Sequence, residues 1–103
     1  MIIAISASES NSGAPVDAHF GRCPFFGIYD TTTKMLSFVE NRGKDNTKEA
    51  GRLVVDQLLE LGTTVVVAGR FGNKVIEMLR SKGVQMVVVA QGQTVDNIIN
   101  KIK

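Results

Sequence analysis

Short, unbroken runs of aliphatic residues alternate with stretches of helical periodicity, and this alternation constrains the fold more than any other feature. The runs cover residues 2–5, 65–67 and 87–89. A strand that is apolar at successive positions has no face left for water, so each run predicts a strand covered on both faces. The spacing of apolar residues becomes helical between the later runs. The sequence therefore predicts an α/β domain.

Two further segments predict a hairpin that precedes the first helix. Residues 25–30 and 35–40 have the composition of strands, and a threonine-rich turn joins them. This spacing predicts an antiparallel pair, whereas the helix between the last two strands implies a right-handed parallel crossover. The expected order is β-β-β-α-β-α-β-α. A five-stranded mixed sheet covered by helices is the simplest arrangement that buries every apolar run.

The helices are predicted from apolar residues that recur every three or four positions, within residues 50–61, 75–79 and 95–102. Gly62 and Gly83 are expected to end the first two helices. Asn46, with Glu49 three positions later, resembles a capping box at the start of the first helix. Thr94 is expected to cap the third helix.

Composition and charge exclude several classes of protein. The chain has 103 residues, of which 44% are hydrophobic and 21% charged, as expected for a single folded domain over residues 1–103. A net charge of +2, evenly scattered, predicts neither a nucleic-acid partner nor a polybasic membrane arm. The single cysteine cannot form an internal disulfide, and no apolar stretch approaches the ~20 residues that span a bilayer. The residues at the start lack the features of a signal peptide, so the expected location is the cytoplasm.

Ligands of open sheets gather at the carboxyl ends of parallel strands, where loops 6–22, 69–73 and 91–94 are expected. Gly69 and Gly72 would let the backbone of the middle loop approach a ligand, and the helix start after them favours an anion. Arg70 would add a fixed positive charge with forked donors. The alternative is that these glycines only permit the turn. The loop matches neither the phosphate-loop pattern nor the dinucleotide fingerprint.

The loop before the hairpin contains His19 and Cys23, the only histidine and the only cysteine of the chain. Imidazole and thiolate are good ligands for borderline and soft metals, but two such residues fall short of a closed zinc site. They could anchor a preformed cluster whose metals already carry sulfide. The alternative is a surface histidine beside an inert cysteine.

Catalysis is not expected. A thiol enzyme needs a base that is itself oriented and an oxyanion hole, and Asp17 could orient His19 only if the loop folded back on itself. A nuclease on a mixed sheet would carry carboxylates on its central strands to hold Mg²⁺, and residues 1–6 and 63–68 carry none. The sequence therefore predicts a binding protein and not an enzyme.

Three motifs together resemble the dinitrogenase iron-molybdenum cofactor biosynthesis family, also called nitrogenase accessory factors. They are Pro-Val-Asp-Ala-His-Phe-Gly-Arg at residues 15–22, Val-Val-Ala-Gly-Arg-Phe-Gly at residues 66–72 and Gly-Gln-Thr-Val at residues 92–95. The resemblance covers residues 1–103. Many relatives carry further histidine or cysteine residues before the first helix, and residues 41–48 have none.

The resemblance implies a ribonuclease H-like motif and a non-catalytic carrier or sensor of iron-molybdenum cofactor or its iron-sulfur precursor, linked to nitrogen fixation. It implies His19 as a cluster ligand and Cys23 as a second ligand, with a cofactor-synthesis or acceptor protein as partner. The residues expected to bind the cluster are His19, Phe20, Gly21, Arg22, Gly69, Arg70 and Gly72. The alternative function is regulatory binding of a small anion or nucleotide at the Arg70 loop.

Overall fold

The computed structural model describes residues 1–45 and 49–102. Within these ranges the chain forms five strands and three helices in the order predicted from the sequence. The elements are β1 (Ile2–Ala7), β2 (Phe25–Asp30), β3 (Met35–Glu40), α1 (Ala50–Glu60), β4 (Thr63–Ala68), α2 (Asn73–Ser81), β5 (Gln85–Val88) and α3 (Val95–Ile102).

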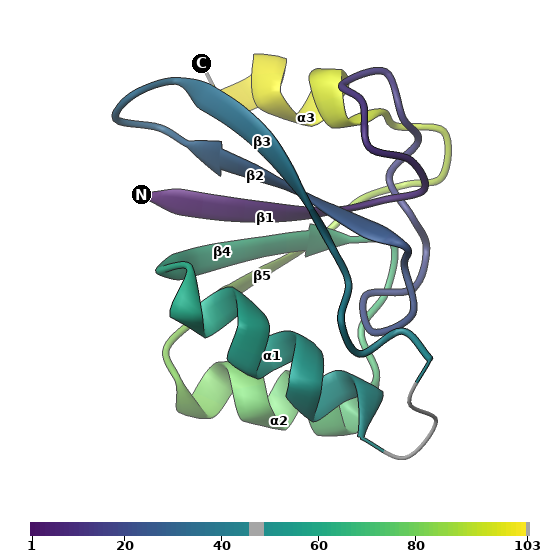
Figure 1. Cartoon of the computed structure of the whole chain (residues 1–103), viewed down its shortest axis with the longest axis vertical. Coiled ribbons are helices and arrows are strands. Elements are labelled where there is room, and N and C mark those ends of the chain that lie inside the picture. The colour runs from purple at the N-terminus through teal and green to yellow at the C-terminus, as the bar shows by residue number, and fades with distance from the viewer. Residues whose placement is uncertain (46–48, 103) are drawn as a thin grey trace.

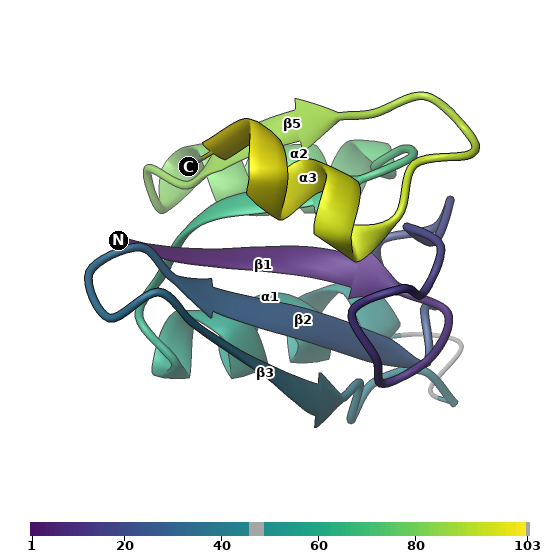
Figure 2. The same cartoon turned by 90° about the horizontal axis from the view of Figure 1, so that it is seen from above.

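The strands form one mixed sheet in the order β3-β2-β1-β4-β5 (Figure 2). The hairpin of β2 and β3 is antiparallel, and β2 also pairs antiparallel with β1. β4 runs parallel to both of its neighbours, β1 and β5. The predicted mixed sheet is therefore confirmed, and it is compatible with a ribonuclease H-like motif. Because β1 and β4 are parallel neighbours, the loops that follow them emerge at the same end of the sheet.

The helices cover the two faces unequally, with α1 and α2 on one face and α3 on the other (Figure 1). Successive side chains of a strand point to opposite faces, so the central strand must be apolar at every position. Ala4 packs into the core under α1 and α2, whereas Ile3 and Ile5 pack into the core under α3. This double burial explains the unbroken aliphatic run at the start of the sequence.

The bounds of β5 differ from the prediction. The valine run predicts a strand at residues 87–89, but pairing with Val65–Ala68 of β4 places the strand at Gln85–Val88. β5 is an edge strand, and the side chain of Val88 is 66% exposed. Register with the neighbouring strand, and not the apolar run itself, sets where β5 begins and ends.

Most of the predicted helix ends are confirmed. Gly62 and Gly83 follow α1 and α2 with φ of +82° and +71°, the left-handed backbone that favours glycine. Thr94 Oγ1 accepts a hydrogen bond from the Asn97 amide at 3.1 Å, and Asn97 Oδ1 accepts one from the Thr94 amide at 3.0 Å. Asn46 of the predicted capping box lies outside the described residues.

The described helices have 11, 9 and 8 residues, and none of them combines the length and apolarity that crossing a membrane requires.

Candidate functional site

The loops that follow β1 and β4 are joined by backbone hydrogen bonds. The amide of Gly69 donates to the carbonyl of Asp17 at 3.2 Å, and the amide of Arg70 donates to the carbonyl of Ala18 at 2.8 Å. The amide of Phe20 donates back to the carbonyl of Arg70 at 3.4 Å, and His19 and Arg70 form a parallel bridge. Main-chain contacts therefore place Arg70 beside His19, as predicted from the expected adjacency of the two strands.

The two loops approach each other so closely at Gly69 that no larger residue fits there without a shift of the backbone. A Cβ at this position would lie 2.7 Å from Ala18 Cα and 3.1 Å from Ala18 O, which are backbone atoms that cannot move aside cheaply. Gly69 was predicted to let the backbone approach a ligand, but the structure shows it against the neighbouring loop. At Gly72 no atom lies within 4 Å of an added Cβ. Of the two glycines, only Gly69 is fixed by close packing.

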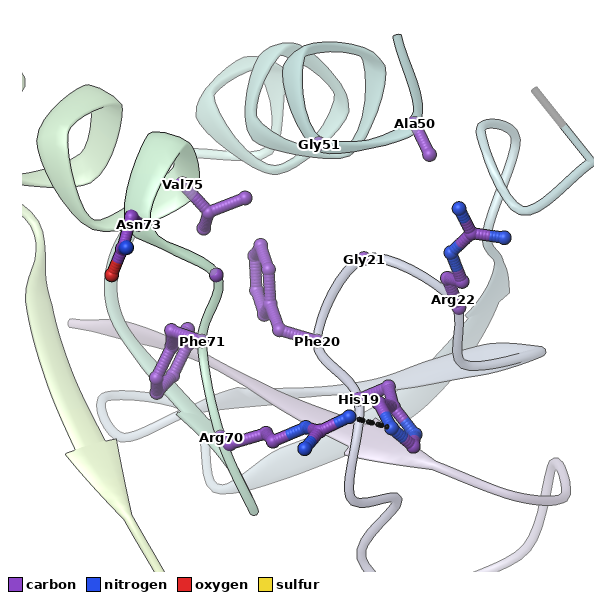
Figure 3. Close-up of a pocket in the computed structure, with 11 residues that line it drawn as sticks. His19, Phe20, Gly21, Arg22, Ala50, Gly51, Arg70, Phe71, Asn73 and Val75 are labelled. Carbon is purple, nitrogen blue, oxygen red and sulfur yellow. Dashed lines mark hydrogen bonds between the residues drawn. The ribbon is translucent and has the colours of Figure 1, made fainter. Parts of the chain in front are cut away.

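The side chains of His19 and Arg70 meet at the end of the sheet (Figure 3). Arg70 Nη2 lies 2.6 Å from His19 Nε2. A guanidinium can only donate hydrogen bonds, so Nε2 must accept, and the imidazole must be neutral with its proton on Nδ1. Asp17 does not orient the ring, because its Oδ1 accepts from the backbone amide of His19 at 2.9 Å.

An open pocket of about 490 Å³ adjoins this pair. Six of the seven residues predicted to bind a cluster line it, namely His19, Phe20, Gly21, Arg22, Arg70 and Gly72. Gly69 lies outside it and lines a separate pocket of about 230 Å³ beside Gln91. The 91–94 loop, which was also expected at this end of the sheet, therefore borders the smaller pocket.

Sequence reasoning missed the part of the pocket that the helices supply. Ala50 and Gly51 line it from the first turn of α1, and Asn73 and Val75 line it from the first turn of α2 (Figure 3). A signal was present, because a glycine inside a helix is unfavourable unless something approaches it closely. A Cβ on Gly51 would lie 2.7 Å from Val75 Cγ2, so this glycine lets α1 and α2 approach each other.

The electrostatics of the pocket favour negative charge. Among the described residues, the N-cap positions of α1 and α2 provide no side-chain hydrogen bond to the first turn, so the amide groups of those turns are not satisfied by these caps. Arg22 and Arg70 are exposed, and neither forms a salt bridge with any residue that the structure describes. Two guanidinium groups that no described carboxylate neutralises, together with two helix starts, attract an anion.

Comparison with known families identifies the family of this chain. The family model described as dinitrogenase iron-molybdenum cofactor matches residues 1–103. The chain belongs to this family. Membership associates the protein with iron-molybdenum cofactor biosynthesis and with the binding of a metal cluster.

Solved structures of similar proteins share the fold over nearly the whole chain. The apo form of the orange protein from Desulfovibrio gigas is 25% identical, with a TM-score of 0.91, 98% of this chain covered and 85% of that chain. A Thermotoga protein provisionally named as a NifB protein, of the DUF35 family, is 27% identical, with a TM-score of 0.83 and the same coverage of 98% and 85%. No curated protein sequence matched this member of the dinitrogenase iron-molybdenum cofactor family.

Phe20 forms the apolar base of the family's expected binding loop. Its side chain is 1% exposed, and its ring centroid lies 5.5 Å from that of Phe26 and 5.1 Å from that of Phe71. Phe20 therefore anchors the loop in the core under α1 and α2, and it also lines the pocket. Its predicted role in binding stays a prediction, and its packing role is shown.

Cys23, the second expected ligand, is placed in the core and not in the pocket. Its side chain is 0% exposed, and Sγ donates a hydrogen bond to the carbonyl of Phe20 at 3.3 Å. Burial raises the pKa of this thiol from 9.0 to about 12. The thiolate is the form that binds metal, so the structure argues against a ligand role for Cys23. No group of three or more His, Cys, Asp or Glu side chains in the described ranges is arranged to hold a metal ion.

We expect Cys23 to make the stability of the protein fall at high pH. The thiol ionises near pH 9 in the unfolded chain but only near pH 12 in the fold, so the unfolded state loses protons first. The stabilising effect is intact below pH 9 and is lost as the pH rises toward 12. Between about pH 8.5 and pH 10.5 the wild type should lose about 2 kcal/mol more than Cys23→Ala, measured by urea denaturation.

A thiol reagent provides an independent check of the same burial. Cys23 should react slowly in the native protein and rapidly in denaturant. Fast labelling of the native protein, with equal pH dependence of the two variants, would show that the thiol is exposed and restore it as a candidate ligand.

Proposed function

We propose that this protein carries or senses an anionic metal-sulfur cluster, either iron-molybdenum cofactor or an iron-sulfur precursor, in the pocket beside His19. The observation that carries the proposal is the meeting of the chain's only imidazole with Arg70 at the edge of the pocket. The imidazole supplies a metal ligand and the guanidinium supplies a donor for sulfide or another anionic group. A cofactor-synthesis or acceptor protein would be the partner that delivers or receives the cluster.

The small number of protein ligands supports a preassembled cluster over a bare metal ion. A bare ion needs about four ligands from the protein, and the pocket offers one histidine. A cluster whose metals are already bound by sulfide needs only one or two ligands. Its remaining negative charge would be met by Arg22, Arg70 and the amides of two helix starts.

A binding role, and not a catalytic one, is part of this proposal. Asp17 accepts a hydrogen bond from the backbone amide of His19, and Cys23 is buried, so Asp17, His19 and Cys23 do not form an oriented pair of base and nucleophile. The second candidate is the binding of a phosphate-bearing anion or nucleotide. It is favoured by Arg70 and by the start of α2, where the N-cap residue Gly72 provides no side-chain hydrogen bond.

The test is an anaerobic titration of the protein with a synthetic four-iron, four-sulfur cluster and with isolated iron-molybdenum cofactor. Binding is measured by visible absorbance and by metal analysis after gel filtration. A colourless protein that instead binds ATP or inorganic phosphate would support the second candidate and contradict the first.

We expect His19→Ala to weaken cluster binding at least tenfold, about 1.4 kcal/mol. The melting temperature should change little, because the side chain of His19 is exposed. Lys82→Ala, an exposed position at the far end of α2, is the control that should leave both quantities unchanged. A large fall in melting temperature with unchanged binding would show a structural histidine.

A further inference from the structure

One ring nitrogen of His19 is already engaged in a hydrogen bond in the structure. Nε2 accepts from Arg70 Nη2 at 2.6 Å, and this bond requires the ring proton to be on Nδ1. A metal binds neutral imidazole through the nitrogen lone pair, which is the same lone pair that Arg70 uses. Nothing can therefore bind to His19 through Nε2 until the guanidinium moves away.

The side chain of Arg70 is free to make this movement although its backbone is fixed. Its amide and carbonyl are bonded to Ala18 and Phe20, which holds the Cα beside the neighbouring loop. The side chain is exposed, and within the described part of the chain no carboxylate forms a salt bridge with it. The hydrogen bond to His19 is the side-chain contact that would be exchanged.

We infer that Arg70 determines which metal species His19 can bind, because it excludes free metal cations and gives way to metal species that are themselves anionic. This inference rests on the proposed role of His19 as a ligand. A divalent cation would have to break the bond from Arg70 and then remain beside a displaced positive charge. An anionic cluster would break the same bond but offer sulfide as a new acceptor for the guanidinium, so little would be lost.

The neighbouring arginine provides a matched control. Arg22 lines the same pocket, is exposed and carries the same charge. Its backbone amide donates to the carbonyl of His19 at 3.4 Å, but within the described structure its guanidinium makes no hydrogen bond to the imidazole ring. Removing Arg22 lowers the positive potential of the pocket without freeing Nε2. Comparing the two positions separates the specific block of the lone pair from general charge repulsion.

The experiment measures Cu²⁺ binding by wild type, Arg70→Met, Arg22→Met and His19→Ala, because copper binds imidazole most strongly among divalent first-row ions. Electron paramagnetic resonance identifies the copper bound to His19 as the nitrogen-coupled signal that is missing in His19→Ala. Arg70→Met should raise the Cu²⁺ affinity of that site at least tenfold, and Arg22→Met by no more than about threefold. Equal affinities in wild type and Arg70→Met, or equal effects of the two arginine variants, would overturn the inference.

The same variants are then titrated with the synthetic four-iron, four-sulfur dianion. The effect of Arg70→Met on affinity should be opposite to its effect on copper binding. Arg70→Met should bind this cluster more weakly than wild type, at least threefold, although it binds copper more strongly. Stronger binding of both metal species by Arg70→Met would contradict selection by charge. If wild type binds no cluster, the proposed function fails, whereas the copper comparison still decides whether Arg70 blocks His19.

Discussion

Truncation of Phe20 to alanine is expected to lower the free energy of unfolding by about 3–5 kcal/mol. Phe20 is 1% exposed, and its ring packs between those of Phe26 and Phe71. Removal of the ring leaves a cavity under α1 and α2 that the sheet and helices cannot close. A domain of this size has a total stability of only about 5–15 kcal/mol, so the change should be obvious in a urea denaturation curve.

Phe71→Ala is the matched control, because it removes the same ring from the same aromatic contact. Phe71 is only half-buried, so its loss should reduce stability clearly less than the loss of Phe20. Equal effects at the two positions would show that Phe20 does not anchor the loop. Phe20→Leu retains much of the packing, which makes it the variant for asking whether the ring also contacts a bound cluster.

Replacement of Gly69 by alanine should have the second largest effect, on both stability and binding. The added Cβ would lie 2.7 Å from Ala18 Cα, so the two loops must separate. Overpacking of this kind destabilises proteins by about 1–3 kcal/mol. Because the same contact places Arg70 beside His19, cluster binding should also weaken by about tenfold or more, although Gly69 does not line the pocket.

Gly72→Ala tests whether the effect at Gly69 is steric. An added Cβ meets no atom within 4 Å, and φ at Gly72 is −71°, which any residue adopts. Because alanine is a poorer helix N-cap than glycine, stability should still fall by about 0.5–1 kcal/mol, which is less than the loss expected at Gly69. Loss of stability of the same size at Gly69 and Gly72 would rule out the close contact with Ala18 as the cause. Thermal denaturation and cluster titration of both variants give the comparison.

Much of the fold was predictable because buried segments need apolar residues at positions that the sequence shows directly. The run at residues 2–5 is apolar at every position because β1 is covered on both faces, and Thr94 caps α3 as its position predicts. The meeting of His19 with Arg70 followed from one assumption about topology, that β1 and β4 are neighbours. Strand adjacency determines which loops meet, so this part of the site was predictable as well.

The direction of loop side chains was not predictable. Glycine and proline around Cys23 predict a loop, but they do not determine which side chain points inward. Cys23 is buried through tertiary contacts, because Asn41 Nδ2 donates to its carbonyl at 2.8 Å and to that of Gly21 at 3.1 Å. These two hydrogen bonds join the loop to Asn41, which follows the hairpin. Such a long-range contact cannot be predicted from a local sequence pattern. The contribution of α1 to the pocket depends in the same way on how closely two helices pack.

The pairing of β1 with β4 also has a kinetic consequence. His19 and Arg70 are 51 positions apart, and the contacts that join their loops close a long segment of chain. Contacts between distant residues form slowly, because the entropy of closing the loop is lost before the contact stabilises anything. The hairpin and the helices can form from local contacts, whereas the pocket exists only after this long-range step. Partly folded or partly synthesised chains therefore expose their strands without offering the ligand its site.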